Sequence, residues 1–222
     1  MPKTRNIALT ESSDQLQLNP GASAGAKVTW INNTNVDCTV TFAQSPFPDS
    51  SYFVPARGKK SATVNESVAP GTYAYTCSAG TVSTDGAIVI VVGISGHAEI
   101  SITATAGQLQ LTPGAAAGDT VNWVNLDSDP YTMQDFNPAN PQLFPQTSYN
   151  VPANGSKSAT VNNNVTVGTA YAYQCSPSAT GGTIIIVDPP GATEPESEKG
   201  TQRSYSKPLQ EKEIVGVGGS RR

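Results

Sequence analysis

Three cysteines and one histidine are the residues of this chain best suited to nucleophilic, redox or metal-binding chemistry. The cysteines are Cys38, Cys77 and Cys175, and the histidine is His97. A nucleophilic Ser or Cys needs a nearby imidazole as its base, and most transition-metal sites use imidazole ligands. A single histidine cannot serve such sites in more than one place. The sequence therefore predicts a protein that is not an enzyme.

Two of the cysteines occupy equivalent places in an internal repeat. Residues 73–78 (YAYTCS) return as residues 171–176 (YAYQCS), an offset of 98. Residues 28–32 (VTWIN) return as residues 121–125 (VNWVN), an offset of 93. Matched blocks in the same order indicate a duplicated unit, and the change in offset places small insertions in the middle loops.

The duplication predicts two domains, residues 1–95 and residues 97–189, which we call repeat 1 and repeat 2. They join next to His97. The remaining residues, 190–222, are rich in Glu, Lys, Ser and Pro and contain few apolar side chains. Such a segment buries too little apolar surface to order itself, so we expect a disordered charged tail.

Each repeat has the pattern of β-structure. Apolar and polar residues alternate in 27–31 and 38–42, and the most apolar runs, 87–92 and 183–187, are predicted central strands. No segment shows a convincing helical period. Short strands separated by Gly and Pro turns predict an all-β fold of two antiparallel sandwiches. We expect Trp30 and Trp123 at the centres of their cores.

Charge and hydropathy exclude several partners. The chain has 13 basic and 17 acidic residues, a net charge of −4. Residues 190–222 contain six of the basic and five of the acidic residues, so the rest carries seven and twelve, a net charge of −5. This acidic body is unsuited to nucleic acid. No apolar run of about 18 residues predicts a membrane span. No signal peptide is evident, so the localisation is left open: extracellular or periplasmic if one has been removed, otherwise cytoplasmic.

Two motifs resemble the cupredoxin family. Residues 118–125 (GDTVNWVN) are similar to the cupredoxin G-D-x-V-x-W-x-N strand, and residues 173–178 (YQCSPS) are similar to the Y-x-C-S-P-H loop that carries copper ligands. Because the repeats match each other, the resemblance extends over both. It implies a Greek-key β-sandwich in each repeat.

The same resemblance locates the copper ligands, which in this family are two His, one Cys and a weak axial Met. The positions that match the two His and the Cys contain no histidine; they are Cys38, Cys77 and Gly80 in repeat 1 and Tyr131, Cys175 and Ser178 in repeat 2. Neither loop contains the axial Met, and Met133 lies on another predicted strand. The resemblance thus implies degenerate copper sites, and we predict no cofactor.

In the family, the positions of Cys38 and Cys77 converge on one point. We therefore predict a disulfide between them, which would close a loop of about 40 residues and stabilise the fold by about 3–4 kcal/mol on the chain-entropy model. A buried pair of reduced thiols and a two-thiolate Cu(I) site are the alternatives. Cys175 has no partner in its own repeat and is predicted to be a small core residue.

The end of the tail combines apolar and basic residues. Val215, Val217, Gly218, Arg221 and Arg222 form a candidate docking motif that faintly resembles the C-terminal loading peptides of encapsulin cargo proteins. The alternative is a frayed terminus without a partner. A docking motif predicts association with a protein partner or a larger particle.

The preferred function is therefore a structural or interaction protein that either assembles with itself or docks through its tail. One alternative is copper binding or electron transfer through non-standard ligands, either Cys38 with Cys77 or Cys175 with Met133. Another is a surface or adhesion module that binds carbohydrate or protein near Tyr131 or Phe136. Fold resemblance does not choose among these functions.

Overall fold

Every regular element in the described part of the chain is a β-strand. The computed structural model describes residues 3–12, 15–93, 96–105, 108–178 and 180–188. The prediction of an all-β fold is confirmed. No helix among the described residues is long and apolar enough to span a bilayer.

Each repeat contributes eight strands. Those of repeat 1 are β1 (Thr4–Ser12), β2 (Gln15–Ala22), β3 (Lys27–Asn32), β4 (Cys38–Phe42), β5 (Ser51–Val54), β6 (Lys59–Thr63), β7 (Gly71–Ala79) and β8 (Val82–Ile90). Those of repeat 2 are β9 (Ala98–Thr105), β10 (Gln108–Ala115), β11 (Thr120–Asn125), β12 (Tyr131–Asn137), β13 (Ser148–Val151), β14 (Ser156–Thr160), β15 (Ala170–Ser176) and β16 (Thr180–Ile186). The matched blocks of sequence thus form matched strands.

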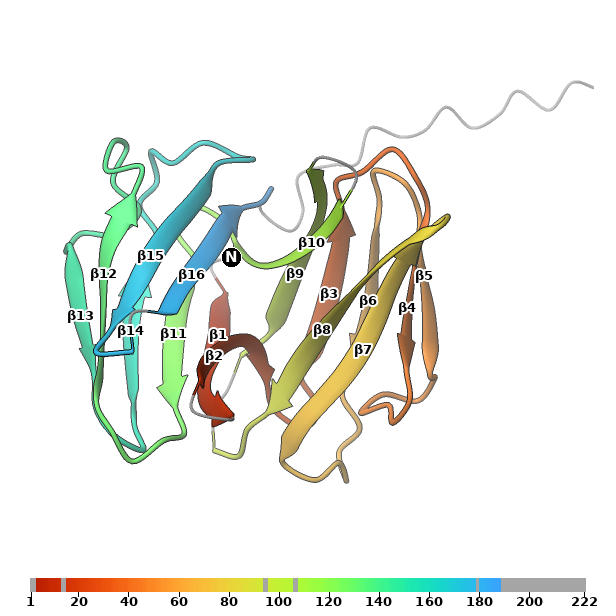
Figure 1. Cartoon of the computed structure of the whole chain (residues 1–222), viewed down its shortest axis with the longest axis horizontal. Helices are drawn as coiled ribbons and strands as arrows, with labels where there is room; N and C mark the ends of the chain where they lie inside the picture. Colours follow the sequence, from red (N-terminus) through yellow and green to blue (C-terminus); the bar gives the residue numbers. More distant parts are fainter. Residues whose placement is uncertain (1–2, 13–14, 94–95, 106–107, 179, 189–222) are drawn as a thin grey trace, which may run out of the picture. The chain divides into compact units, whose positions relative to one another are not determined.

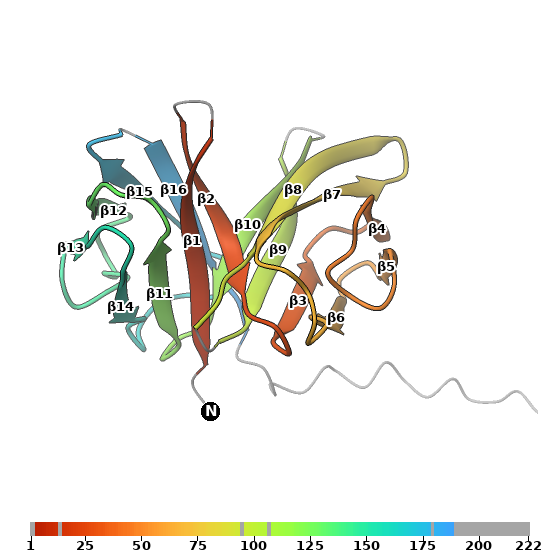
Figure 2. The same cartoon turned by 90° about the horizontal axis from the view of Figure 1, so that it is seen from below.

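The strands form two eight-stranded sheets, and each sheet runs through both repeats. One has the order β14-β11-β1-β2-β8-β7-β4-β5, and the other has the order β13-β12-β15-β16-β10-β9-β3-β6. In Figures 1 and 2 the hairpins β1–β2 and β9–β10 lie in the middle of the molecule, with the other strands of each repeat on either side. The sheets pass from one repeat to the other through these two hairpins.

The first strand of each repeat is exchanged with the other repeat. β1 pairs in parallel with β11, from Thr4 opposite Thr120 to Leu9 opposite Asn125. In the same way β9 pairs in parallel with β3, from Val28 opposite Ala98 onwards. β2 and β10 then return to their own repeats, since β2 pairs with β8 and β10 pairs with β16. The exchange is therefore reciprocal.

The two hydrophobic cores follow the exchange. Ile7, Leu9 and Leu16 of repeat 1 are buried in the core around Trp123. Ala98, Ile100, Ile102 and Leu109 of repeat 2 are buried in the core around Trp30. The boundary at residues 95–97 stays a prediction of where the repeats join along the sequence, and each core is built from both sides of it.

An aromatic cluster fills the centre of each core, as predicted for the tryptophans. Trp30 and Trp123 are fully buried. Trp30 stacks on Tyr52 with ring centroids 5.5 Å apart, and Trp123 lies 5.5 Å from Tyr149. The other rings around them meet largely edge to face, a favourable geometry for aromatic pairs; they are Phe42, Phe47 and Tyr75 in one core and Phe136, Phe144 and Tyr173 in the other.

Buried polar contacts hold β1 against repeat 2. The Arg5 Nε atom lies 2.9 Å from Asp119 Oδ2, and both side chains are buried. The backbone N–H of Lys3 donates to Asp119 Oδ1 at 2.8 Å. Asn122 Nδ2 donates to Asn6 Oδ1 at 3.0 Å. Since charged and amide groups removed from water need partners, these contacts specify the pairing of β1 with β11.

Two glycines allow close packing where the repeats cross. A Cβ atom at Gly86 would lie 2.6 Å from the ring of Tyr75 and 2.7 Å from Leu111 of β10. At Gly182 it would meet the ring of Tyr173 and lie 2.8 Å from Leu18 of β2. Each repeat thus inserts one leucine against a glycine and a tyrosine of the other.

Candidate functional site

In repeat 1 the structure brings together Cys38 and Cys77. They lie on the adjacent antiparallel strands β4 and β7, in which Cys77 pairs with Val40, two residues from Cys38. Both side chains are almost completely buried, with 1% and 0% exposed. The two thiols are close enough for each to influence the pKa of the other, and Cys38 Sγ lies 3.6 Å from the carbonyl oxygen of Val36. We call Cys38 and Cys77 the thiol pair.

The thiol pair is reduced in the structure. Both cysteines are free thiols, so the predicted disulfide is not present. Burial raises the pKa of Cys38 and raises that of Cys77 to about 12. A thiolate next to a second thiol in an apolar core is poorly solvated, which is why the protonated form is favoured. At neutral pH neither sulfur is a ready nucleophile or metal ligand.

A buried asparagine orders the loop that leads to Cys38. Asn32 Nδ2 donates to the carbonyl oxygens of Val36 at 2.8 Å and Val54 at 3.2 Å. Its Oδ1 atom accepts hydrogen bonds from both the N–H and the hydroxyl of Thr34. This structural role was not predicted from the sequence, although Asn32 ends the repeated VTWIN block.

Its counterpart in repeat 2 is Asn125, which makes the same kind of contacts. Asn125 Nδ2 donates to the carbonyl oxygens of Asp129 at 2.7 Å and Pro152 at 3.1 Å, and its Oδ1 accepts from the N–H of Asp127. The sequence signal for this role was the presence of an asparagine at the end of the matched block in both repeats. Both asparagines have a structural role, since every bond they make is within the protein.

In repeat 2 the equivalent position holds Tyr131, Met133 and Cys175, which we call the Tyr131 site. Tyr131 and Met133 are on β12, and Met133 pairs with Cys175 of β15. Met133 and Cys175 are fully buried. The Tyr131 hydroxyl lies 3.3 Å from Asp127 Oδ2. Burial raises the pKa of Cys175 to about 11, so its thiol is also protonated at neutral pH.

The two positions predicted to replace the second copper-binding histidine lie in turns. Gly80 has φ of +59°, a left-handed conformation that glycine adopts readily, and it is exposed between β7 and β8. The Ser178 hydroxyl donates to the carbonyl oxygen of Cys175 at 3.1 Å and accepts from the N–H of Thr180. Both residues therefore serve the turn that follows the cysteine.

These donor sets do not fit a blue-copper ion. Such a site needs two imidazoles beside the thiolate. Neither the thiol pair nor the Tyr131 site includes a histidine. The described residues contain no group of three or more His, Cys, Asp or Glu side chains that could hold a metal ion. His97 accepts a hydrogen bond at Nδ1 from the N–H of Lys27, the first residue of β3. Asn32, which orders the loop before Cys38, is at the other end of that strand.

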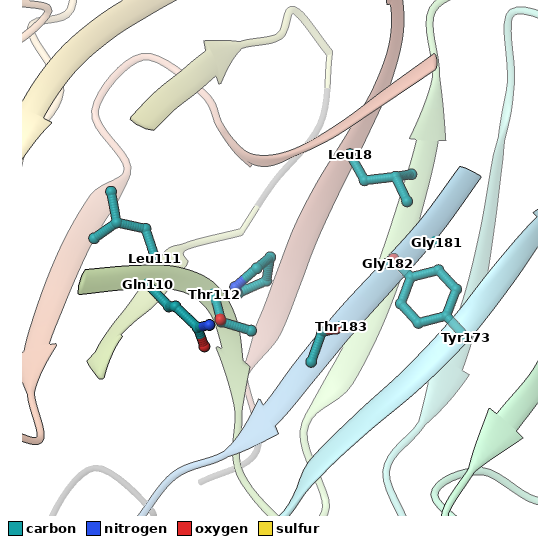
Figure 3. A pocket seen from close by; sticks show the side chains of 9 residues that line it. Leu18, Gln110, Leu111, Thr112, Tyr173, Gly181, Gly182 and Thr183 are labelled. Carbon is teal, nitrogen blue, oxygen red and sulfur yellow. The ribbon is translucent and has the colours of Figure 1, made fainter. Parts of the chain in front are cut away.

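A cavity of about 360 Å³ lies where β10 and β16 diverge. The two strands pair only through residues 114–115 and 185–186, and the space beyond is lined by Tyr173, two glycines and Leu18 of the other repeat (Figure 3). Its remaining lining residues are Gln110, Leu111, Thr112, Pro113 and Thr183. None of them carries a charge at neutral pH, so the cavity offers no acid, base or ionic contact for a ligand.

The tail residues proposed for docking, Val215, Val217, Gly218, Arg221 and Arg222, lie outside the described residues. The site that the structure does describe is therefore the pair of buried cysteine positions, one in each repeat.

No protein-family model matches this sequence, and no curated protein matches it. Among solved structures it is similar to the Cu-containing nitrite reductase NirK of Thermus scotoductus, at 10% identity over 86% of this chain and 68% of that chain, with a TM-score of 0.27. A copper nitrite reductase of Nitrosomonas europaea gives 10% identity, 88% and 96% coverage and a TM-score of 0.27. The BSP domain of a biofilm associated protein gives 18% identity, 73% and 26% coverage and a TM-score of 0.26.

These similarities are weak, and none carries an argument about function. The β-sandwich that the resemblance to cupredoxins implied is present in the structure itself, in its paired sheets and its two aromatic cores.

Proposed function

We propose that this chain is a non-enzymatic structural or interaction protein, built from two cupredoxin-like repeats whose copper sites have become part of the hydrophobic core. The observation that carries the proposal is the burial of the cysteine side chains at both positions, with no imidazole beside them; this burial also raises the pKa of each thiol. A side chain sealed in this way contributes packing and not chemistry. What remains available for binding is the outer surface and the tail.

Edge strands are one part of that surface. The sheets end at β14 and β5 and at β13 and β6, and a strand at a sheet edge offers backbone groups to another chain. On β5 the side chain of Phe53 is 57% exposed. An exposed aromatic ring on an edge strand supports self-association or the binding of a protein partner.

A second candidate function is the binding of a soft metal ion by the thiol pair. It is favoured by the position of Cys38 and Cys77 on adjacent strands in one buried cluster, because two thiolates are suitable ligands for Cu(I). The raised pKa values oppose it, since both protons must leave before the metal binds.

Metal loading distinguishes the two functions. The full chain is incubated with Cu(II), or with Cu(I) under reducing conditions, then desalted and analysed for copper. We expect no copper–thiolate absorption and no more bound copper than in a Cys38→Ser, Cys77→Ser, Cys175→Ser variant. One copper per chain that is lost in Cys38→Ser would instead establish the second function.

Light scattering on the full chain tests the interaction role directly. We expect association beyond the monomer, or a stable complex with a captured particle, to decrease when residues 190–222 are deleted. A full chain that stays monomeric and binds nothing, with or without the tail, would contradict the proposal.

A further inference from the structure

Strand β5 is the last strand of its sheet, so one of its edges faces no other strand of the described chain. It lies at the outer end of repeat 1 (Figures 1 and 2). Just before β5, the carbonyl oxygen of Ser50 accepts a hydrogen bond of 2.8 Å from the N–H of Phe42. Because backbone groups alternate in direction along a strand, Ser51 and Phe53 turn theirs away from β4. We call these outward backbone groups the β5 edge.

The four outer strands of the two sheets differ in how they discourage pairing with another chain. Lysine on an edge strand is a common device against such pairing. Lys59 and Lys60 lie on β6, and Lys157 lies on β14. The sequences of β5 (SYFV) and β13 (SYNV) contain no charged residue. They differ in one position, where β5 has the exposed ring of Phe53 and β13 has Asn150.

Repeat 2 supplies an internal control, because the surroundings of β13 match those of β5. The N–H of Asp49 donates to the hydroxyl of Tyr52, as the N–H of Gln146 donates to the hydroxyl of Tyr149. The two strands lead into the similar sequences VPARG and VPANG. Three matched positions therefore differ in chemistry: Asp49, Phe53 and Arg57 in repeat 1 correspond to Gln146, Asn150 and Asn154 in repeat 2. The fold does not require the acid, the ring or the base, since repeat 2 forms the same strand without them.

These three side chains form a pattern that is complementary to itself. Asp49 precedes β5, Arg57 follows it, and both are exposed. When two copies of one strand pair antiparallel about a two-fold axis, the start of each lies beside the end of the other. Such a pairing brings Asp49 of each copy towards Arg57 of the other, where opposite charges attract. It also places the two Phe53 rings on one face of the joined sheet, within reach of each other.

We propose that two copies of this chain associate through their β5 edges, in antiparallel orientation. The backbone groups of Ser51 and Phe53 supply the hydrogen bonds between the copies, and the charges of Asp49 and Arg57 select the orientation. This inference rests on the proposed function, because it names a second copy as the partner of an edge strand considered there. Each copy contributes only four strand residues, so we expect a weak dimer.

Sedimentation velocity on the full chain tests the proposal, at concentrations from about 10 µM to about 1 mM, where weak complexes form. We expect the mean mass to rise from monomer to dimer and to stop there, since a two-fold contact is closed. Phe53→Asn, which introduces the residue of repeat 2, should raise the Kd of the dimer about tenfold or more. Val92→Asn is the matched control and should leave it unchanged, because Val92 is 74% exposed and follows β8.

Charge reversal tests the orientation of the two strands. Asp49→Lys should weaken the dimer, because the new cation approaches Arg57 of the other copy. Arg57→Glu should weaken it in the same way, through Asp49. A chain with both substitutions should recover most of the loss, since opposite charges face each other again.

A full chain that stays monomeric at about 1 mM would overturn the proposal. So would a dimer that Phe53→Asn leaves unchanged, or charge reversals that the double variant does not rescue. An unchanged far-ultraviolet circular dichroism spectrum for each variant ensures that a weaker dimer reports on the β5 edge and not on unfolding.

The failure of this inference is distinguishable from that of the proposed function. Association that persists in Phe53→Asn would exclude the β5 dimer and leave the interaction role standing. Copper bound by the thiol pair would contradict the proposed function and leave the β5 dimer untouched.

Discussion

The two repeats fill the same structural position with different side chains. Repeat 1 places two small thiols there, Cys38 and Cys77, whereas repeat 2 combines Cys175 with the larger Tyr131 and Met133. All five side chains are buried, and each filling belongs to a continuous core. The difference shows that packing is the shared requirement at this position, because two sets of unlike shape and chemistry meet it.

The strand junctions differ in a second way. At the β1–β11 junction Arg5 and Asp119 form a buried ion pair. The matching residues at the β9–β3 junction are Ala98 and Ala26, both buried. These two matched positions thus hold an ion pair at one junction and two alanines at the other. Four experiments test these differences between the repeats.

The largest effect is expected from removing one tryptophan. Trp123→Ala deletes the central side chain of a core and should lower the free energy of unfolding by about 3–5 kcal/mol. Because β1 belongs to both the Trp123 core and the sheet of repeat 1, we expect the loss to reach both repeats. Urea unfolding followed by the fluorescence of Trp30 measures this. If the urea midpoint of the Trp30 fluorescence transition did not change, the two cores would be independent in spite of the strand exchange.

Breaking the ion pair should have an effect of similar size. Asp119→Ala leaves Arg5 buried without its carboxylate and should lower the free energy of unfolding by about 3–5 kcal/mol, since an uncompensated buried charge is unfavourable. Arg5→Ala combined with Asp119→Ala reproduces the pair of alanines found at the other junction and should restore much of the loss. Urea unfolding of both variants gives the comparison. Equal stability of the single and double variants would contradict it.

The pH dependence of stability separates the buried thiols from exposed ones. Unfolded thiols ionise near their ordinary pKa of 9.0, whereas burial raises the folded pKa of Cys175 to about 11 and that of Cys77 to about 12. Their contribution is therefore full below pH 9.0 and is lost as the pH rises towards the folded values. Between these limits each thiol should add about 1.4 kcal/mol per pH unit to the decline.

Urea titrations at several alkaline pH values measure that decline. Cys77→Ala and Cys175→Ala should each make it shallower by one thiol's share, with the difference for Cys77 persisting to higher pH. An identical slope in the unmodified chain and both variants would show that the thiols are accessible to solvent.

The smallest effects are expected in the turns that follow the two cysteines. Gly80→Ala should lower stability by about 1 kcal/mol, because the left-handed backbone disfavours a Cβ atom and no other atom lies close by. Ser178→Ala removes two hydrogen bonds at an exposed site and should lower it by about 0.5 kcal/mol. Thermal unfolding of both variants checks the order. A larger loss of stability for Ser178→Ala would mean that its hydrogen bonds to Cys175 and Thr180 also stabilise structure outside this turn.

Much of each repeat could be predicted from local pattern. Val28 and Trp30 are separated by one polar residue, and this alternation predicted that both lie on the same face of a strand. Both are buried in β3. The apolar run 87–92 overlaps the end of β8 but extends two residues past Ile90, and the strand begins earlier, at Val82, among polar residues that the pattern did not identify. The site was partly predictable too, since the resemblance pointed to the cysteine positions. It could not give their redox state, which depends on their environment and not on their spacing.

Residue type and local period are enough to predict that the chain is duplicated, all-β and without the histidines of a copper site. They do not predict which core each first strand completes, which became evident from the folded chain. The apolar residues Ile7 and Leu9 of β1 match Ile100 and Ile102 of β9, so each strand is suited to either core. That choice depends on contacts between residues more than 100 positions apart, such as Arg5 with Asp119, and a local pattern contains no information about them.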